Sequence, residues 1–133
     1  MTCTDVQRHH VFVLGEHPDT CDLYRDILEG EGYRVSHAAV AEWELTLSDT
    51  QPPCLILLDL PFSDEIAATM FLARLSAASL AAAVPLLVCS TQHTLLATWC
   101  AQLSAHGGGT LRKPFNLQEL LIAVWASVTA RER

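Results

Sequence analysis

Asp59, Ser90 and Lys113 lie at the ends of three short predicted strands, in residues 53–60, 85–91 and 110–116, and the first two of these segments are mostly apolar. An apolar run this short predicts a strand buried on both faces of a parallel sheet covered by helices. Ligands and reactions gather beyond the carboxyl ends of such strands. We therefore expect a carboxylate, a hydroxyl and an ammonium group to converge at one edge of the sheet, as the polar groups of a site.

Each of these residues also has an ordinary structural interpretation. Asp59 would serve as a turn former or helix cap after its strand. Ser90 would bond its own backbone at the end of a strand, and Lys113 would be a solvated surface lysine. The occurrence of all three groups at successive strand ends favours the functional interpretation.

The segments that must position these groups alternate between strand and helix patterns. Besides the three segments above, strands are predicted at residues 10–14 and 33–37. Helices are predicted from Pro18 to the glycines at 30 and 32, and over residues 41–47, 64–82, 93–105 and 117–130. Five strands alternating with five helices predict a doubly wound α/β fold with right-handed crossovers.

Two motifs give this pattern a family resemblance: Leu-Ile-Leu-Leu-Asp, ending at Asp59, and Lys-Pro-Phe, beginning at Lys113. With Ser90 between them, the chain resembles the receiver domain of two-component response regulators over residues 8–130. The resemblance implies a flavodoxin-like five-stranded parallel sheet in the order 2-1-3-4-5. It also implies a Lys–Pro peptide bond that is often cis.

The resemblance assigns a role to each of the three polar residues. Asp59 would accept a phosphoryl group from a histidine kinase or a phosphotransfer protein. Ser90 would donate its hydroxyl to a phosphoryl oxygen, and Lys113 would pair with another phosphoryl oxygen as a point charge.

A magnesium site is implied as well, with Glu16, Asp59 and the carbonyl of Pro61 as ligands. Receivers usually carry two adjacent acids after the first strand, and Gly15 stands in place of the first acid. Removal of one carboxylate is expected to weaken Mg²⁺ binding. The alternative for Glu16 is a solvated acid at a helix start, where the helix dipole favours it.

Two further positions depart from the switching residues of receivers. Thr110 lies three residues before Lys113, where an aromatic side chain is usual, and Thr91 replaces the small residue that usually follows Ser90. A threonine cannot repeat the large rotamer swing of a ring. Signal output through Thr110 is therefore expected to differ from that of typical receivers.

The composition predicts a single cytoplasmic domain. A chain of 133 residues, half of them hydrophobic, can build one globular core. A formal net charge of −7 without a basic stripe argues against nucleic-acid binding. Neither a signal peptide nor a membrane span is recognised, so no membrane contact is expected. The five scattered cysteines contain no Cys-x-x-Cys pair and are expected to be reduced.

Residues 75–111 contain no Asp, Glu, Lys or Arg, although they must include the surface helix 93–105. A surface helix without charge favours contact with a downstream protein or a second copy, here through Leu95, Leu96 and Trp99. The ordinary alternative is an Ala-rich helix with small surface side chains.

Three functions remain open at this point. The first is a stand-alone receiver, not an enzyme, that is phosphorylated on Asp59 and signals by protein contact. The second is a pseudo-receiver that binds proteins without phosphorylation, which Gly15, Thr91 and Thr110 favour. The third is a flavin- or nucleotide-binding enzyme, but Glu16 puts an acid where such an enzyme would bind an anion.

Overall fold

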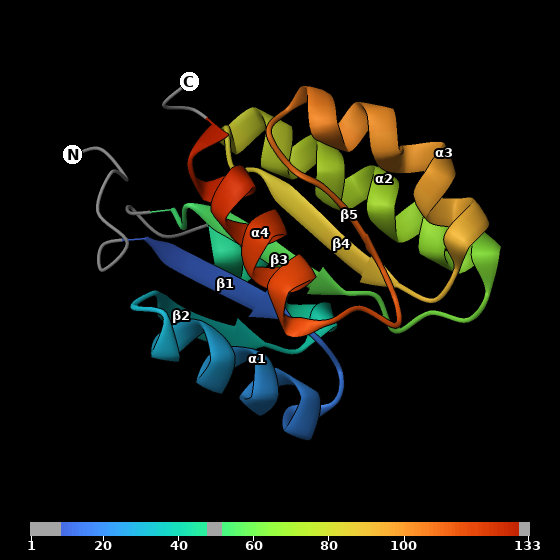
Figure 1. Cartoon of the computed structure of the whole chain (residues 1–133). Helices are drawn as coiled ribbons and strands as arrows, with labels where there is room; N and C mark the ends of the chain where they lie inside the picture. The colour runs from blue at the N-terminus through green and yellow to red at the C-terminus, as the bar shows by residue number, and fades with distance from the viewer. Residues whose placement is uncertain (1–8, 48–51, 131–133) are drawn as a thin grey trace.

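A single parallel sheet of five strands organises the chain (Figure 1). The computed structural model describes residues 9–47 and 52–130, so Arg8, the first residue of the predicted domain, lies outside it. The sheet order is β2-β1-β3-β4-β5, which confirms the predicted order 2-1-3-4-5. The strands are β1 (His10–Leu14), β2 (Arg34–Ala38), β3 (Leu55–Asp59), β4 (Leu86–Ser90) and β5 (Gly109–Arg112).

Burial along the strands follows their place in the sheet. Every residue of β3 and β4 is buried, whereas the edge strands β2 and β5 are mostly half-buried or exposed. The continuous apolar runs in the sequence are therefore the strands that helices cover on both faces. The parallel register pairs Asp59 with Cys89, and Ser90 with Arg112. The ends of β3, β4 and β5 thus meet at one edge.

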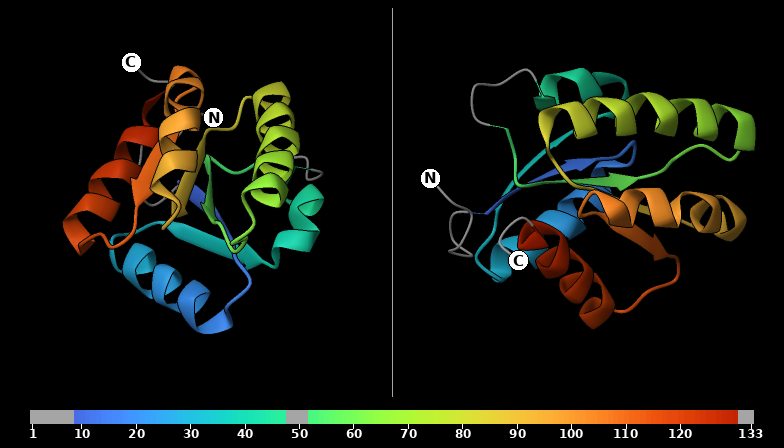
Figure 2. Two further views of the ribbon diagram at one scale, coloured as in Figure 1. Left: turned by 90° about the vertical axis from the view of Figure 1, so that its right-hand side faces the viewer. Right: turned by 90° about the horizontal axis from the view of Figure 1, so that it is seen from above.

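Helices cover both faces of the sheet (Figure 2). Helices α1 (Pro18–Gly30) and α4 (Leu117–Val128) pack on one face, where Leu28 and Val124 join the core. The other face carries α2 (Glu65–Ala82), α3 (His93–Ala105) and the 3₁₀ helix η2 (Val40–Leu47). The sheet side chains alternate between these two hydrophobic clusters, as the two-residue period of a strand requires.

The prediction of five α-helices was wrong for one of them. The segment predicted as a helix over residues 41–47 forms η2, a 3₁₀ helix interrupted at Glu42 by non-helical backbone angles, so the described residues contain four α-helices. A segment of eight residues gains too few hydrogen bonds to offset the nucleation of an α-helix. The last helix also ends at Val128, two residues earlier than predicted.

Local capping explains where the longer helices begin. The Asn116 side chain accepts a hydrogen bond from the Glu119 N–H, and the Glu119 side chain accepts one from the Asn116 N–H, which forms a capping box at the start of α4. The Asp64 carboxylate caps α2 by accepting from the Ile66 N–H. These short polar side chains fix the first turns of α2 and α4.

The cysteines do not all match the expectation of reduced thiols. Cys21, Cys89 and Cys100 are free, as expected. Cys54, in contrast, is disulfide-bonded, so the expectation was wrong at this position. Sequence spacing alone gave no sign of this bond, because no Cys-x-x-Cys pair is present.

The close approach of Gly108 to β4 gives a test of the fold. A Cβ atom added at Gly108 would lie 2.0 Å from the backbone oxygen of Leu86. We expect Gly108→Ala to lower the free energy of unfolding by about 3 kcal/mol, because backbone atoms of a paired strand cannot give way. Gly30→Ala is the matched control, since its added Cβ meets nothing within 4 Å. Equal stability of the two variants in urea denaturation would contradict this packing.

Candidate functional site

Asp59 and Lys113 form an ion pair at the carboxyl edge of the sheet. Asp59 ends β3 and is 5% exposed, and the ammonium group of Lys113 donates to its Oδ1 atom. Lys113 immediately follows β5, so two strands separated by β4 supply the two charges. The structure therefore brings together the carboxylate and the ammonium group that the sequence predicted.

Ser90 closes β4 between these two residues. It is 1% exposed, and its hydroxyl oxygen accepts a hydrogen bond of 2.9 Å from the Gln92 N–H. This is a local turn contact, the ordinary role that the sequence left open for Ser90. The Ser90 carbonyl accepts a hydrogen bond from the Lys113 N–H at 2.9 Å, so the backbone of Ser90 helps to place the lysine.

The backbone around Lys113 is held from two sides. The Lys113–Pro114 peptide bond is cis, as the resemblance implied. A ring nitrogen of His93, at the start of α3, lies 2.9 Å from the Lys113 carbonyl oxygen. The Lys113 N–H is thus held by the Ser90 carbonyl and the Lys113 carbonyl by His93. These two contacts fix the position from which the lysine side chain extends.

Three neutral groups surround the Asp59 carboxylate. Burial, followed by the charge of Asp59, raises the pKa of the Cys89 thiol to about 12. Burial also raises the pKa of Tyr24, whose hydroxyl shares a hydrogen bond with Cys89. Burial and then Asp59 raise the pKa of Cys21. All three groups remain protonated at neutral pH, and Lys113 supplies the cationic charge in contact with Asp59.

The predicted metal ligands differ in exposure, since Asp59 is buried and Glu16 is not. Gly15 does lie beside Asp59, because a Cβ atom added there would be 3.5 Å from the Asp59 Cβ. Glu16 is exposed, however, and its carboxylate accepts a hydrogen bond from the Val40 N–H at 3.0 Å. Within residues 9–47 and 52–130, no three His, Cys, Asp or Glu side chains are close enough to hold a metal ion. Pro61 is half-buried two residues after Asp59.

The expected partner residues on α3 are mostly core residues. Leu95 is 3% exposed and Leu96 is 1% exposed, and Trp99 packs against the same hydrophobic cluster. They occupy the inner face of α3, because the helix uses its few large apolar side chains to cover the sheet. Leu95 and Leu96 are therefore not accessible to a partner, whereas a contact through the half-buried Trp99 or another part of α3 stays a prediction.

Several residues at this edge were not recognised in the sequence. Gln92 bonds Ser90 through its backbone and donates its side-chain amide to the Phe62 carbonyl, which links the loops after β3 and β4. The hydrogen bond from the Gln92 N–H to the Ser90 hydroxyl was predictable, because a serine that ends a strand often accepts from the N–H two residues later. The contact of His93 with the Lys113 carbonyl had no such signal, because it joins two loops far apart in the chain.

Comparison with solved structures identifies the fold. A response regulator receiver domain protein from Clostridium thermocellum has 15% sequence identity and a TM-score of 0.72, over 94% of this chain and 98% of that chain. A receiver domain protein from Methanospirillum hungatei has 20% identity and a TM-score of 0.71, over 93% and 96%. The receiver domain of Francisella response regulator 1452 has 21% identity and a TM-score of 0.66, over 95% and 100%.

At these identities the likeness concerns the fold, and it confirms the resemblance to receiver domains. A scan against protein-family models gives no match. A search of curated protein sequences gives none either.

The buried thiol beside Asp59 makes the fold sensitive to alkaline pH. An unfolded Cys89 titrates at its ordinary pKa of 9.0, whereas the folded thiol keeps its proton to about pH 12. The stabilising contribution is therefore complete below pH 9 and is lost as the pH rises towards 12. We expect the free energy of unfolding to fall more steeply in this range for wild type than for Cys89→Ala. Cys100→Ala, at an exposed thiol, is the control and should follow the wild type.

Proposed function

We propose that this chain, which has the receiver-domain fold, is a receiver that accepts a phosphoryl group on Asp59. The observation that supports this most directly is the contact between the Lys113 ammonium group and the buried Asp59 carboxylate. A lysine held over a carboxylate at this edge is suited to balance the charge of an incoming phosphoryl group. Ser90, at the end of the intervening strand, supplies a hydroxyl donor.

The transfer that we propose uses the free oxygen of the carboxylate. Lys113 contacts Oδ1, so Oδ2 forms the bond to phosphorus while the phosphorus–nitrogen bond of a phosphohistidine breaks. The histidine leaves with the electron pair and takes up a proton. Lys113 then remains beside the phosphoryl group as its counter-charge. The donor is a histidine kinase or a phosphotransfer protein, and the signal passes on by protein contact in the cytoplasm.

The residues present do not make a complete magnesium site. Asp59 supplies one carboxylate and Pro61 one carbonyl, but Gly15 has no side chain and the Glu16 carboxylate already accepts the Val40 N–H. A hard divalent cation prefers several oxygen ligands. We therefore propose that Mg²⁺ binds weakly here, and no step of the transfer above is assigned to it.

Phosphorylation is tested with a small acyl-phosphate donor, with and without Mg²⁺, followed by intact-mass analysis. The wild type should gain one phosphoryl group and Asp59→Asn none. Asp64→Asn is the matched control, since Asp64 is an exposed acid close by in the chain and asparagine preserves its helix cap. This control should be phosphorylated like the wild type. A wild type that gains no mass under any of these conditions would favour a phosphorylation-independent binding module.

The missing carboxylate gives a test of the metal proposal. Aspartate at position 15 would place a second acid beside Asp59, but its Cβ would lie 3.0 Å from the Cys21 sulfur. We therefore compare Gly15→Asp/Cys21→Ala with Cys21→Ala alone, so that the contact is relieved in both proteins. The dissociation constant for Mg²⁺, measured by calorimetry, should fall at least tenfold on adding the carboxylate. Equal values would place Gly15 outside the metal site.

A further inference from the structure

Helix α2 exposes large apolar side chains along its outer face. Ile66 is 71% exposed, Met70 is 64% exposed and Leu80 is 50% exposed. The helix is long and apolar enough to cross a membrane by composition, but it packs on the sheet through a buried face. A helix that is apolar on all sides is normally covered on all sides. The described part of the chain covers only one face of α2.

The exposed apolar residues form one regular line, which we call the outer stripe of α2: Ile66, Met70, Ala73, Ala77 and Leu80. Their spacing alternates between four and three residues, which is the spacing of the contact positions in a coiled coil. The stripe runs over four turns, about 21 Å at 1.5 Å per residue. A second helix is therefore the shape that fits it best.

We propose that the outer stripe of α2 is a self-association surface, on which α2 of a second copy packs antiparallel. The proposal does not depend on phosphorylation of Asp59. It is separate from the predicted contact through α3, where Leu95 and Leu96 are buried.

The sizes of the side chains support an antiparallel pair. Large residues stand at both ends of the stripe and alanines in its middle. A two-fold axis at Ala73 places Ile66 opposite Leu80 of the second copy, and Met70 within one residue of Ala77. Each large side chain near the middle then meets a small one, as knobs-into-holes packing requires. A parallel pair would place Met70 against Met70 and leave a gap between the alanines.

Charge distribution favours a second copy at this face. The chain carries a net charge of −7, so most approaches of two copies are repulsive. Helix α2 has two charged residues, Glu65 and Arg74, and the Arg74 guanidinium lies over the Trp43 ring, 5.8 Å from its centroid. The neighbouring α3 has none. Leu80 and Gln102 line one small pocket, so the stripe borders this uncharged helix.

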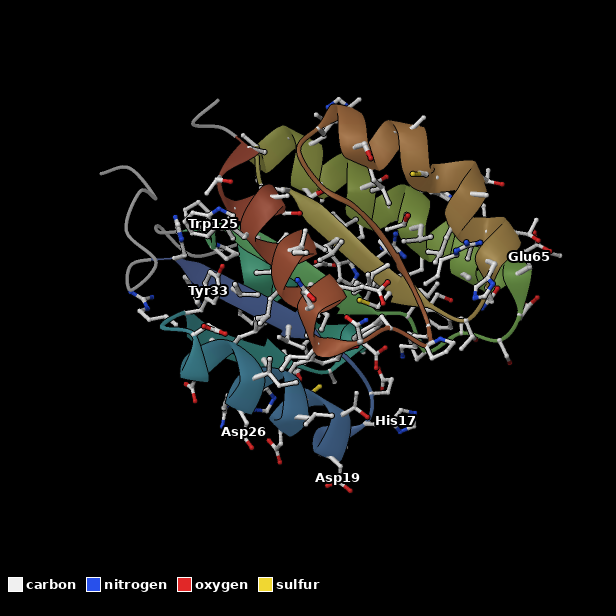
Figure 3. The ribbon with its side chains drawn as sticks, in the orientation of Figure 1. His17, Asp19, Asp26, Tyr33, Glu65 and Trp125 are labelled. Carbon is white, nitrogen blue, oxygen red and sulfur yellow. The ribbon has the colours of Figure 1, made fainter. Side chains whose placement is uncertain are left out.

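The opposite side of the molecule is unsuited to a second copy. Helix α1 exposes four acids, Asp19, Asp22, Asp26 and Glu29. Figure 3 shows Asp19 and Asp26 projecting outward from α1, far from Glu65 at the start of α2. Two copies that met through α1 would bring these acids together, and like charges at a contact oppose association.

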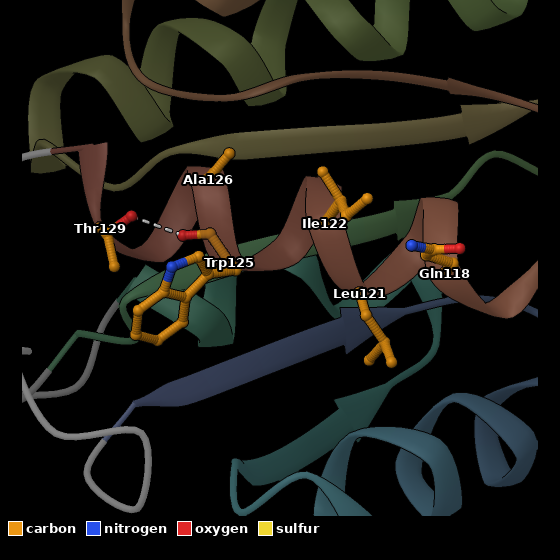
Figure 4. A pocket seen from close by; sticks show the side chains of 6 residues that line it. All are labelled: Gln118, Leu121, Ile122, Trp125, Ala126 and Thr129. Carbon is orange, nitrogen blue, oxygen red and sulfur yellow. Dashed lines mark hydrogen bonds between the residues drawn. The ribbon is translucent and has the colours of Figure 1, made fainter.

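The outer face of α4 is a weaker candidate for the same reason. It forms an open apolar groove around Ile122 and Trp125, in which Thr129 donates a hydrogen bond to the Trp125 carbonyl (Figure 4). Glu31 lines the adjoining pocket beside Trp125, and Glu119 is exposed at the start of the helix. A second copy would therefore meet acids at both ends of this groove.

The size of the stripe sets the strength of the association. A contact about 21 Å long and about 10 Å wide is well below the roughly 800 Å² per partner of a standard stable interface. We therefore expect a transient dimer that appears with rising concentration. A membrane surface is a poorer fit, because interfacial helices are normally rich in Lys and Arg on their polar face, whereas α2 carries a single cation.

Sedimentation velocity over a range from about ten micromolar to about one millimolar tests the proposal, since transient contacts fall in this range. The wild type should shift from monomer to dimer. Met70→Lys and Ala77→Glu should each raise the dissociation constant at least tenfold, because each puts an unpaired charge in the stripe. An equimolar mixture of the two should associate again, since the antiparallel arrangement places residue 70 next to residue 77 of the second copy, where opposite charges attract.

Leu23→Lys is the matched control, because Leu23 is 60% exposed on α1 and lies off the stripe. It should dimerise like the wild type, and circular dichroism should show unchanged helicity in all variants. A wild type that stays monomeric throughout the range overturns the proposal. Failure of the mixture to associate overturns the antiparallel arrangement. Binding of the monomer to phosphatidylcholine vesicles, lost in Met70→Lys, would assign the stripe to a lipid surface instead.

Discussion

The burial of β3 between two helical layers is the constraint on which the rest of the structure depends. It requires an uncharged strand, so the one carboxylate of the strand stands at its end, where the backbone leaves the sheet. There Asp59 is surrounded by groups whose raised pKa values keep them neutral, and Lys113 offsets its charge. An uncompensated carboxylate at this depth would oppose folding. The same ion pair therefore offsets the buried charge and holds the ends of β3 and β5 together.

Much of this edge was predictable because local sequence fixes where a buried strand ends. The apolar runs located Asp59, Ser90 and Lys113, and the parallel order brought them together. Contacts between loops were not predictable, because they depend on how separate crossovers meet in space. Glu16 illustrates this limit: its role as a metal ligand stays a prediction, and nothing in the sequence indicated that its carboxylate accepts a hydrogen bond from the Val40 N–H of a distant segment.

The absence of charged residues from 75 to 111 indicated that the protein has an unusually apolar surface. It did not indicate which helix carries the exposed apolar side chains. Composition cannot tell which side of a helix faces the sheet. On α3 the leucines are buried and Trp99 is half-buried, whereas α2 has enough apolar residues to cover the sheet and to leave Ile66, Met70 and Leu80 exposed. The apolar content of α3 therefore did not mean that Leu95 and Leu96 are exposed. For short segments such as η2, likewise, periodicity could not separate an α-helix from a 3₁₀ helix.

The hydrogen bond from the Val40 N–H to the Glu16 carboxylate connects the loop after β1, beside Asp59, to the 3₁₀ helix η2. Val40 begins η2, whose Trp43 stacks edge-on against Phe71 of α2 and lies under Arg74. A ligand that engaged the Glu16 carboxylate would free the Val40 N–H and loosen the support of η2 against α2. Thermodynamic linkage works in both directions. If a second partner binds α2 and the ligand changes its affinity by some factor, the partner changes the affinity of the ligand by the same factor.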